Sequence, residues 1–582
     1  MNYFLVEKIL YAEERKQNNK ETIMNTIFVG QSDFKRIREQ NGYYVDKSLF
    51  IEEILKSPFL ITLITRPRRF GKTINLSLLR YFLEKTDQDH SALFDGLAIK
   101  QSDMYTDHFL KYPVIYLTFK DIKSPNWNES FEAMKVLISQ LFEYHAYLLD
   151  SNCLSERQVL DFKEIVDRSA SKVIYENALK MLSEFLYQYH NKLVIILVDE
   201  YDTPIHTGYQ HNYYNEVISF MRNLFSSGLK DNSNIFRGVV TGTLRISKES
   251  IFTGLNNLGV FTSIQKRFNN CFGFDETEVK KMLADFDLSE QYSTISKWYD
   301  GYNFGEKKIF NPWSVVNYIS NSDSQPEPYW LNTSSMEMIE NVITPNKELL
   351  REELNDLIEG KPITKILYEN MRFSDIINPR SELVWSFLLH SGYLKITKEV
   401  ESNLRRTYEI QIPNREVRII YIELIEKWIK NRVELRQLET LLNAMKNGNI
   451  SFFEKHLKKI CLEIMSYHDF AGSPEKVYHA LVLGMLVWLS NDYVIRSNRE
   501  SGYGRYDIIF IPKKKSNQGI IIEFKRIDDD EIVEDVLNDA LKQIEEKRYD
   551  VELKAANIEN IIKLAIGFTN KSVYLKQSTV QE

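Results

Sequence analysis

The sequence predicts an α/β protein in which a doubly wound parallel sheet is followed by a mainly helical region and a smaller α/β/α domain. Four apolar runs predict the first sheet: Phe59–Thr65, Pro113–Phe119, Lys192–Asp199 and Arg237–Thr243. Helix-patterned stretches separate these runs, as parallel strands with crossover helices require. At 582 residues the chain also exceeds the size at which a single core stops growing, which predicts about two to four domains.

Changes in the secondary-structure rhythm place the domain boundaries. We expect an N-terminal extension over 1–29, the parallel-sheet domain over 30–274, a helical, winged-helix-like region over 275–465 and the α/β/α domain over 466–582. Within the helical region, TYEIQIPNREVRIIY predicts a hairpin. In the last domain the expected elements are an apolar helix around 478–489, strands at Tyr506–Ile511, Gly519–Lys525 and Leu564–Thr569, and a helix at Asp530–Arg548.

Composition and charge limit the classes of protein that fit. The net charge of -7 excludes a globally basic nucleic-acid-binding protein but leaves room for a local basic groove. Three widely spaced cysteines exclude a disulfide framework and a cysteine-rich zinc site. The N-terminus turns charged after about ten residues without a small-residue cleavage site, and the longest apolar stretch, 477–489, is too short to span a bilayer. We therefore expect a cytoplasmic protein without membrane contact.

A phosphate-loop motif follows the first apolar run and opens a helix. In RPRRFGKT, a glycine lets backbone N–H groups approach phosphate, the lysine can neutralise the β and γ phosphates, and the threonine hydroxyl can bind Mg²⁺. The usual GxxxxGK[ST] pattern has a glycine where this chain has arginine, so the loop must start along a different path. The residues expected to bind the nucleotide here are Arg66, Pro67, Arg68, Arg69, Phe70, Gly71, Lys72 and Thr73, with Thr73 also a metal ligand.

Acidic residues end the third apolar run, in LVDEYD. Asp199 is expected to hold Mg²⁺, and Glu200 is expected to orient and activate the attacking water. Both lie at the carboxyl edge of the sheet, where open α/β folds bind ligands. Asp202 ends the motif, and the pattern assigns it no role of its own. The sequence therefore predicts ATP and Mg²⁺ as cofactors.

The fourth run ends in TGT, with an arginine two residues beyond. Thr241 or Thr243 could contact the γ-phosphate or water, and Arg245 could stabilise developing charge. Strand-end capping and a solvated arginine explain the same residues equally well.

A second group of charged residues lies on two strands of the C-terminal domain. Glu523 and Lys525 alternate along one strand and so share a face, and Asp507 on the neighbouring strand can join them. Two carboxylates suit Mg²⁺ and the lysine can position water, as phosphodiester hydrolysis requires. A solvent-exposed strand face is the alternative interpretation.

The motifs of the first half resemble a known family. DFKRIREQNGYYVDKSLFIEEIL, LITRPRRFGKT, LVDEYDTPI and WYDGYNFG are similar to those of the AAA-ATPase-like bacterial family over most of residues 30–310. The resemblance implies an AAA+-related P-loop ATPase, in which Arg66 is a family feature. It also implies that Asp46 and Lys47 of YVDK precede the nucleotide site, although a solvated surface position fits them as well.

The C-terminal residues resemble a second family. GYGRYDIIFI and GIIIEFKR are similar to the PD-(D/E)XK nuclease-like domain, over about 465–575. The resemblance implies metal binding by Asp507 and Glu523, catalysis by Lys525 and an auxiliary carboxylate from Glu475. It also matches Gln543 and Tyr549 to the helix that follows. The motif's proline is absent, because Tyr506 precedes Asp507.

Three functions stay open on these residues. The first is an ATP-regulated nuclease acting on DNA or RNA. The second is an ATP-driven switch whose C-terminal domain binds nucleic acid or protein without cutting. A non-enzymatic scaffold ranks last, because it would require both phosphate-site motifs to be accidental. The AAA+ resemblance also suggests a homo-oligomer.

Overall fold

The computed structural model places most of the chain. The residues that the structure describes are 26–244, 251–252, 256–321, 325–330, 336–343, 347–358, 360–369, 381–400, 406–430, 435–465, 492–497, 500–501, 504–505, 508–514, 517–528, 531–569 and 572–579. They form two compact units, one of residues 1–346 and 362–417 and the other of residues 347–361 and 418–582. No helix in these described stretches has the length and apolar character needed to cross a membrane.

A five-stranded sheet, all of whose pairs are parallel, forms the centre of the first unit, in the order β2-β3-β4-β1-β5. Its strands are β1 (Ile61–Thr65), β2 (Val114–Thr118), β3 (Val194–Asp199), β4 (Ile235–Gly242) and β5 (Leu258–Phe261). Every residue of β1 and β3 is buried, so the continuous apolar runs are covered on both faces as predicted. The four expected strands and their parallel arrangement are confirmed. The short edge strand β5 is an addition.

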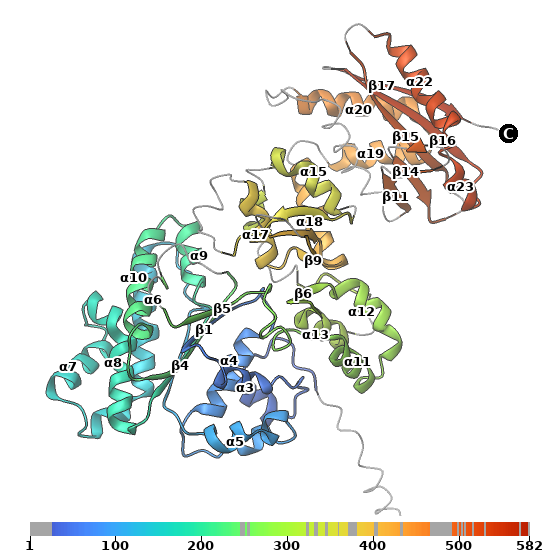
Figure 1. The fold of residues 1–582 in the computed structure, drawn as a ribbon. Coiled ribbons are helices and arrows are strands. Elements are labelled where there is room, and N and C mark those ends of the chain that lie inside the picture. The colour runs from blue at the N-terminus through green and yellow to red at the C-terminus, as the bar shows by residue number, and fades with distance from the viewer. Residues whose placement is uncertain are drawn as a thin grey trace, which may run out of the picture. The chain divides into compact units, whose positions relative to one another are not determined.

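Helices cover both faces of this sheet (Figure 1). Helix α4 packs on β3 from one side, and α8 packs on β2 and β3. Capping boxes explain two of the helix starts, with Ser155 preceding α7 and Asp275 preceding α11. The helices of this domain are α2 (Phe34–Glu39), α3 (Leu49–Leu55), α4 (Lys72–Leu83), α5 (Asp103–His108), α6 (Trp127–Tyr144), α7 (Glu156–Val166), α8 (Lys172–His190), α9 (Thr203–Gln210) and α10 (Tyr214–Leu229), with short 3-10 turns η1 (Ser91–Phe94), η2 (Ala98–Gln101) and η3 (Ala146–Asp150).

A helical segment with its own apolar core follows β5. It contains α11 (Glu276–Asp285), η4 (Ser289–Gln291), α12 (Tyr292–Tyr299), the hairpin β6 (Tyr302–Phe304) and β7 (Lys307–Ile309), α13 (Pro312–Ser320) and α14 (Met336–Ile343). The WYDGYNFG motif is the turn from α12 into this hairpin. Gly301 has a φ of 102°, and a Cβ there would lie 2.0 Å from the Pro413 carbonyl oxygen, so only glycine fits.

A three-stranded sheet completes the first unit, in the order β8-β10-β9. It consists of β8 (Ile363–Ile366), β9 (Lys395–Val400) and β10 (Thr407–Gln411), with α17 (Ser381–His390) beside β8. The hairpin expected within TYEIQIPNREVRIIY is wrong. Strand β10 pairs back to β9, and helix α18 (Arg415–Lys430) follows it. Asn414 accepts from the Val417 amide at 3.0 Å and so caps this helix.

The first turn of α18 carries a buried carboxyl group. Glu416 is 0 % exposed and accepts hydrogen bonds from the Trp330 amide at 2.6 Å and from the Ser314 hydroxyl at 2.9 Å. Burial raises the pKa of Glu416 to about 8, although both hydrogen bonds lower it. The folded unit therefore favours the neutral acid at this position.

The free energy of unfolding is expected to fall as pH rises from about 4.5 to about 8, because the unfolded chain ionises Glu416 first. The titratable side chains that interact with Glu416 are Tyr299, Tyr302 and Tyr329, whose own pKa values are raised by burial, so they stay neutral over this range. Glu416→Gln should remove this dependence, gaining on the order of 3 kcal/mol over wild type at pH 8 and little at pH 5. Thermal unfolding of both proteins across this range measures the difference, and parallel curves would contradict it.

A second five-stranded sheet, with both parallel and antiparallel pairs, forms the C-terminal domain in the order β11-β14-β15-β16-β17. Apolar clusters cover both of its faces. The expected strand–turn–strand–helix–strand order is confirmed at β14, β15, α22 and β16, whereas the expected helix at 478–489 lies outside the described residues. The elements are α15 (Lys347–Ile358), α19 (Leu435–Lys446), α20 (Ile450–Met465), β11 (Tyr493–Ser497), β12 (Glu500–Ser501), β13 (Gly504–Arg505), β14 (Ile508–Pro512), β15 (Gly519–Arg526), α22 (Val533–Glu546), α23 (Val551–Ala555), β16 (Ile561–Phe568) and β17 (Val573–Thr579).

Candidate functional site

The phosphate loop connects the end of β1 to the start of α4. Gly71, the residue before the helix, has a φ of 85°, a left-handed conformation that glycine adopts without strain. Lys72 is 6 % exposed, and its Nζ donates to the carbonyl oxygens of Arg66 and Pro67, at 2.9 Å each. The loop thus closes around the ammonium group, where phosphate oxygens could replace the two carbonyl acceptors.

The electrostatic setting of Lys72 fits an anion with a bound cation. Burial lowers the pKa of Lys72, while the carboxylates of Glu200, Asp202 and Asp199 oppose that shift. A triphosphate would add compensating negative charge beside this buried lysine.

Asp199 joins two threonine hydroxyls at the carboxyl end of β3. Thr73 donates to its Oδ2 at 2.8 Å and Thr241 donates to its Oδ1 at 2.7 Å. Burial raises the pKa of Asp199, and both hydroxyls lower it. A carboxylate and a hydroxyl from the loop are the hard oxygen ligands that Mg²⁺ prefers. The residues at this position therefore fit a magnesium ion.

Glu200 and Asp202 lie beside Asp199 but in different settings. Glu200 lines the adjoining cleft with a φ of 51° and accepts from the Thr203 hydroxyl at 3.2 Å. Asp202 is buried and accepts from the amides of Thr243 and Leu244, at 2.8 and 2.9 Å. Asp202 thus holds the turn after β4, whereas Glu200 faces the space where a reacting water could lie.

The cleft beside these residues has a volume of about 440 Å³ and is lined by both nitrogen-bearing and apolar side chains. The nitrogen-bearing side chains include Arg68, Arg69, Lys72, Lys120, Lys123 and His206. The apolar side chains include Ile27, Phe28, Ile37, Val45, Phe274, Met282, Trp313 and Val316. A cleft that combines cationic and apolar side chains fits a molecule that carries both phosphates and an aromatic base.

Lys120, Lys123 and His206 were not among the expected site residues. Both lysines follow β2, and the rule that placed Asp199 at the carboxyl edge of the sheet could have found them. Burial lowers the pKa of His206 to about 4, and Arg68 and Lys123 lower it further. The neutral imidazole therefore adds a hydrogen-bonding group without adding charge.

Arg66 turns its side chain away from the loop. Its guanidinium is fully buried and donates to the carbonyl oxygens of Thr65, Phe261 and Phe268 at 2.8, 3.0 and 3.0 Å. Burial lowers the pKa of Arg66 to about 10. Only its backbone carbonyl faces Lys72, so the side chain anchors the β5 edge of the sheet.

The other loop residues contact the surrounding segments. Arg69, at a φ of 69°, stacks its guanidinium 4.2 Å from the Trp313 ring centre on α13. Phe70 is buried, with its ring 4.9 Å from that of Tyr302. Arg68 and Arg69 line the cleft, while Arg245 lies outside the described residues.

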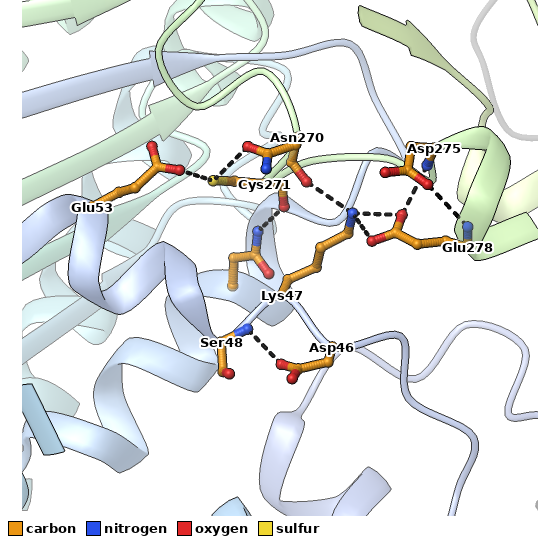
Figure 2. A network of polar contacts seen from close by, with 9 residues as sticks. Asp46, Lys47, Ser48, Glu53, Asn270, Cys271, Asp275 and Glu278 are labelled. Carbon is orange, nitrogen blue, oxygen red and sulfur yellow. Dashed lines mark hydrogen bonds and ion pairs between the residues drawn. The ribbon is translucent and has the colours of Figure 1, made fainter. Parts of the chain in front are cut away.

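The YVDK residues connect the domain core to α11 (Figure 2). Lys47 lines the cleft, but its Nζ donates to the Asn270 carbonyl at 2.8 Å and to both carboxylate oxygens of Glu278 at 2.6 and 2.7 Å. Asp46 accepts from the amides of Ser48 and Ala98 at 2.8 and 2.7 Å. Three acceptors occupy the lysine's three donors, so Lys47 positions α11 relative to the core.

A second polar cluster lies on the C-terminal sheet. Lys525 Nζ lies 3.4 Å from Glu523 Oε1 and donates to Gln543 Oε1 at 2.7 Å. The Gln543 amide nitrogen donates to Glu523 Oε1 at 2.5 Å and to the Tyr549 hydroxyl at 3.0 Å. Glu523 and Lys525 of β15 therefore lie beside Gln543 of α22, which the resemblance matched to the helix that follows.

One carboxylate of this cluster could serve as a metal ligand. Glu523 is 3 % exposed and Lys525 is partly exposed, so a buried carboxylate lies beside an accessible amine. Asp507 and Glu475, the other expected ligands, lie outside the described residues. Within the described stretches, no three His, Cys, Asp or Glu side chains gather to hold a metal.

Comparisons with known proteins agree with this architecture. A family model described as "Predicted AAA-ATPase" matches residues 28–252, and one for the "PD-(D/E)XK nuclease superfamily" matches residues 473–578. An uncharacterised protein from the vnfD 5′ region of Azotobacter chroococcum mcd 1 is 24% identical over 392 residues, which cover 67% of this chain and 68% of the relative.

The solved structures that are similar to this chain include the following two. The Walker-type ATPase PABY2304 of Pyrococcus abyssi is 16% identical, with a TM-score of 0.32 over 64% of this chain and 94% of that one. The ORC2 protein of Aeropyrum pernix, in ADPNP and ADP complexes, is 11% identical, with a TM-score of 0.23 over 69% of this chain and 98% of that one. The two family-model matches thus show an AAA-ATPase-like domain over residues 28–252 and a PD-(D/E)XK nuclease-like domain over residues 473–578.

Proposed function

We propose that the chain binds and hydrolyses ATP with Mg²⁺ at the phosphate loop, and that its nuclease-like domain cuts DNA or RNA in a metal-dependent reaction. One observation carries the ATPase proposal. The Asp199 carboxylate lies between hydroxyls from the phosphate loop and from β4, at 2.8 and 2.7 Å. A P-loop ATPase requires this meeting of loop and strand at one sheet edge.

The residues at this edge of the sheet have separate roles in ATP binding and hydrolysis. Lys72 binds the β and γ phosphates, and the loop amides next to Gly71 contact phosphate oxygens. Thr73 and Asp199 hold the metal, which neutralises charge on the phosphates when it is bound. Glu200 orients water for attack on the γ-phosphate and takes up its proton.

The side chains that line the cleft favour binding of a nucleotide over binding of inorganic phosphate or another small phosphate compound. The apolar side chains of the cleft, among them Trp313 and Met282, supply aromatic and aliphatic surface against which a base can pack. The helical segment after β5 contributes both of these side chains, so it would close one side of the nucleotide site.

Lys72→Ala is expected to weaken ATP–Mg²⁺ binding at least a hundredfold, because it removes the buried charge at the loop centre. Isothermal titration of the full chain measures this loss. Lys56→Ala is the matched control, since Lys56, which follows the last residue of α3, has a 59% exposed side chain that pairs with Glu52 of that helix. Equal ATP affinity in wild type and Lys72→Ala would refute the proposal.

The nuclease half of the proposal is supported by the Glu523, Lys525 and Gln543 cluster. A buried carboxylate can bind a metal, and the adjacent lysine can position water or stabilise a developing negative charge. The ATP-driven switch whose domain binds without cutting remains the alternative, and the cleavage assay in the Discussion separates the two.

A further inference from the structure

The phosphate loop is contacted by two segments far from it in sequence. The Trp330 indole N–H donates to the Arg68 carbonyl oxygen at 3.3 Å, across 262 residues of chain. At the preceding loop residue, a Cβ added to Gly392 would lie 2.7 Å from Pro67 Cβ, so the Gly392 backbone packs closely against the Pro67 ring. Trp330 is 1% exposed, and its ring lies 5.0 Å from that of Tyr393. The outer side of the loop therefore rests on the segments around 330 and 392.

Trp330 is in turn held by the start of α18. Its backbone amide donates to Glu416 Oε1 at 2.6 Å, and Glu416 also accepts from Ser314 on α13 at 2.9 Å. With Glu416 at 0% exposure, no water competes for these bonds. One side chain of α18 thus fixes the residue that touches the phosphate loop.

Helix α18 continues beyond this contact into the other compact unit. It runs from Arg415 to Lys430, and the division between the two units falls after Val417. A continuous helix transmits a displacement of its first turn along its axis more directly than a loop does. The second unit contains the nuclease-like domain.

We propose that Trp330 and Glu416 are positioning residues that brace the phosphate loop and couple its occupancy by nucleotide to helix α18. The inference rests on the proposed binding of ATP. Phosphate would take Lys72 away from the carbonyls of Arg66 and Pro67, which adjoin the Arg68 carbonyl that Trp330 holds. A change of loop shape therefore reaches Trp330 first, and then Glu416 and α18.

The coupling is reciprocal. If nucleotide changes the state of α18, then a change in α18 alters nucleotide affinity by the same factor. A ligand of the C-terminal unit that stabilises one position of α18 would thus raise or lower the affinity for ATP without touching the cleft.

Hydrogen exchange of the full chain, with and without ATP–Mg²⁺, tests the brace in the peptide over residues 418–424. Wild type should show a nucleotide-dependent change in protection there. Trp330→Phe, which keeps an aromatic side chain but removes the indole N–H, should lose that change and raise the KM for ATP roughly fivefold with little effect on kcat, because one hydrogen bond to the loop is gone. Trp127→Phe on α6, away from the loop, is the control and should behave as wild type.

A second pair of variants guards against simple unfolding. Glu416→Gln keeps an acceptor for the Trp330 amide and should retain the nucleotide response, whereas Glu416→Ala should lose it. If wild type binds ATP but residues 418–424 do not respond, or if Trp330→Phe responds like wild type, the brace is refuted while the ATPase stands. If wild type binds no ATP, the proposed function fails and the brace fails with it.

Discussion

Glu200→Gln is expected to lower the rate of ATP hydrolysis by about a hundredfold to ten-thousandfold, the range that loss of a general base produces. ATP affinity should change little, because Glu200 accepts from Thr203 and faces the cleft without holding the loop. Steady-state turnover together with a titration of ATP–Mg²⁺ separates the two effects. The glutamine has the same size and can still bond to Thr203, so the fold should be unaffected.

Two further variants serve as comparisons for Glu200→Gln. Asp199→Asn should reduce both binding and turnover, because Asp199 is shared by the metal site and by the hydroxyls of Thr73 and Thr241. Glu143→Gln, at an exposed position of α6, should change neither. Normal turnover in Glu200→Gln would assign the water-activating role to another group at the cleft.

Lys525→Ala is expected to abolish metal-dependent cleavage of nucleic acid, lowering the rate by at least about a hundredfold. The amine of Lys525 lies next to the buried Glu523 carboxylate and is held by Gln543, so it is placed to act on the water or phosphate at that site. The assay uses the full chain with Mg²⁺ or Mn²⁺, on DNA and on RNA, with and without ATP.

Lys542→Ala is the matched control for the cleavage assay. Lys542 precedes Gln543 on α22, has a 69% exposed side chain and pairs with Glu546 on the same helix. Cleavage that survives Lys525→Ala would remove the lysine from the reaction. Intact substrate in the presence of measured ATP hydrolysis would favour the switch that binds without cutting.

Local sequence patterns predicted the strands that are buried on both faces and the loops that carry a recognisable motif. Strands β1 and β3 are continuous apolar runs, which are typical of buried strands. Because both strands were predicted, Thr73 and Asp199 could be placed at the same edge of the sheet. Strand β5 escaped detection because its four residues include a glycine and give little signal. The start of helix α18 was taken for a strand because Val417, Ile419 and Tyr421 recur at every second residue, as in a strand, and the capping residue Asn414 was overlooked.

Long-range partners could not be predicted from the sequence. Trp330 and Trp313 meet the phosphate loop only because the segments after β5 fold back onto it, and no local pattern encodes that return. The same holds for Glu416, whose burial follows from packing between α13 and α18. The residues in the phosphate-binding motifs could thus be predicted from short sequence patterns. The other residues that line the cleft could not, because long-range packing brings them to the site.

The arginine at the head of the phosphate loop has a consequence for attempts to improve this protein. Its guanidinium satisfies the carbonyl oxygens of Thr65, Phe261 and Phe268 in an interior that offers no water in exchange. Arg66→Gly, which restores the glycine of the common motif, would leave those three carbonyl oxygens without a donor and would create a cavity beside the sheet. Arg66, which departs from the consensus motif, therefore stabilises the β1–β5 edge of the sheet. Its replacement would destabilise the fold without improving nucleotide binding.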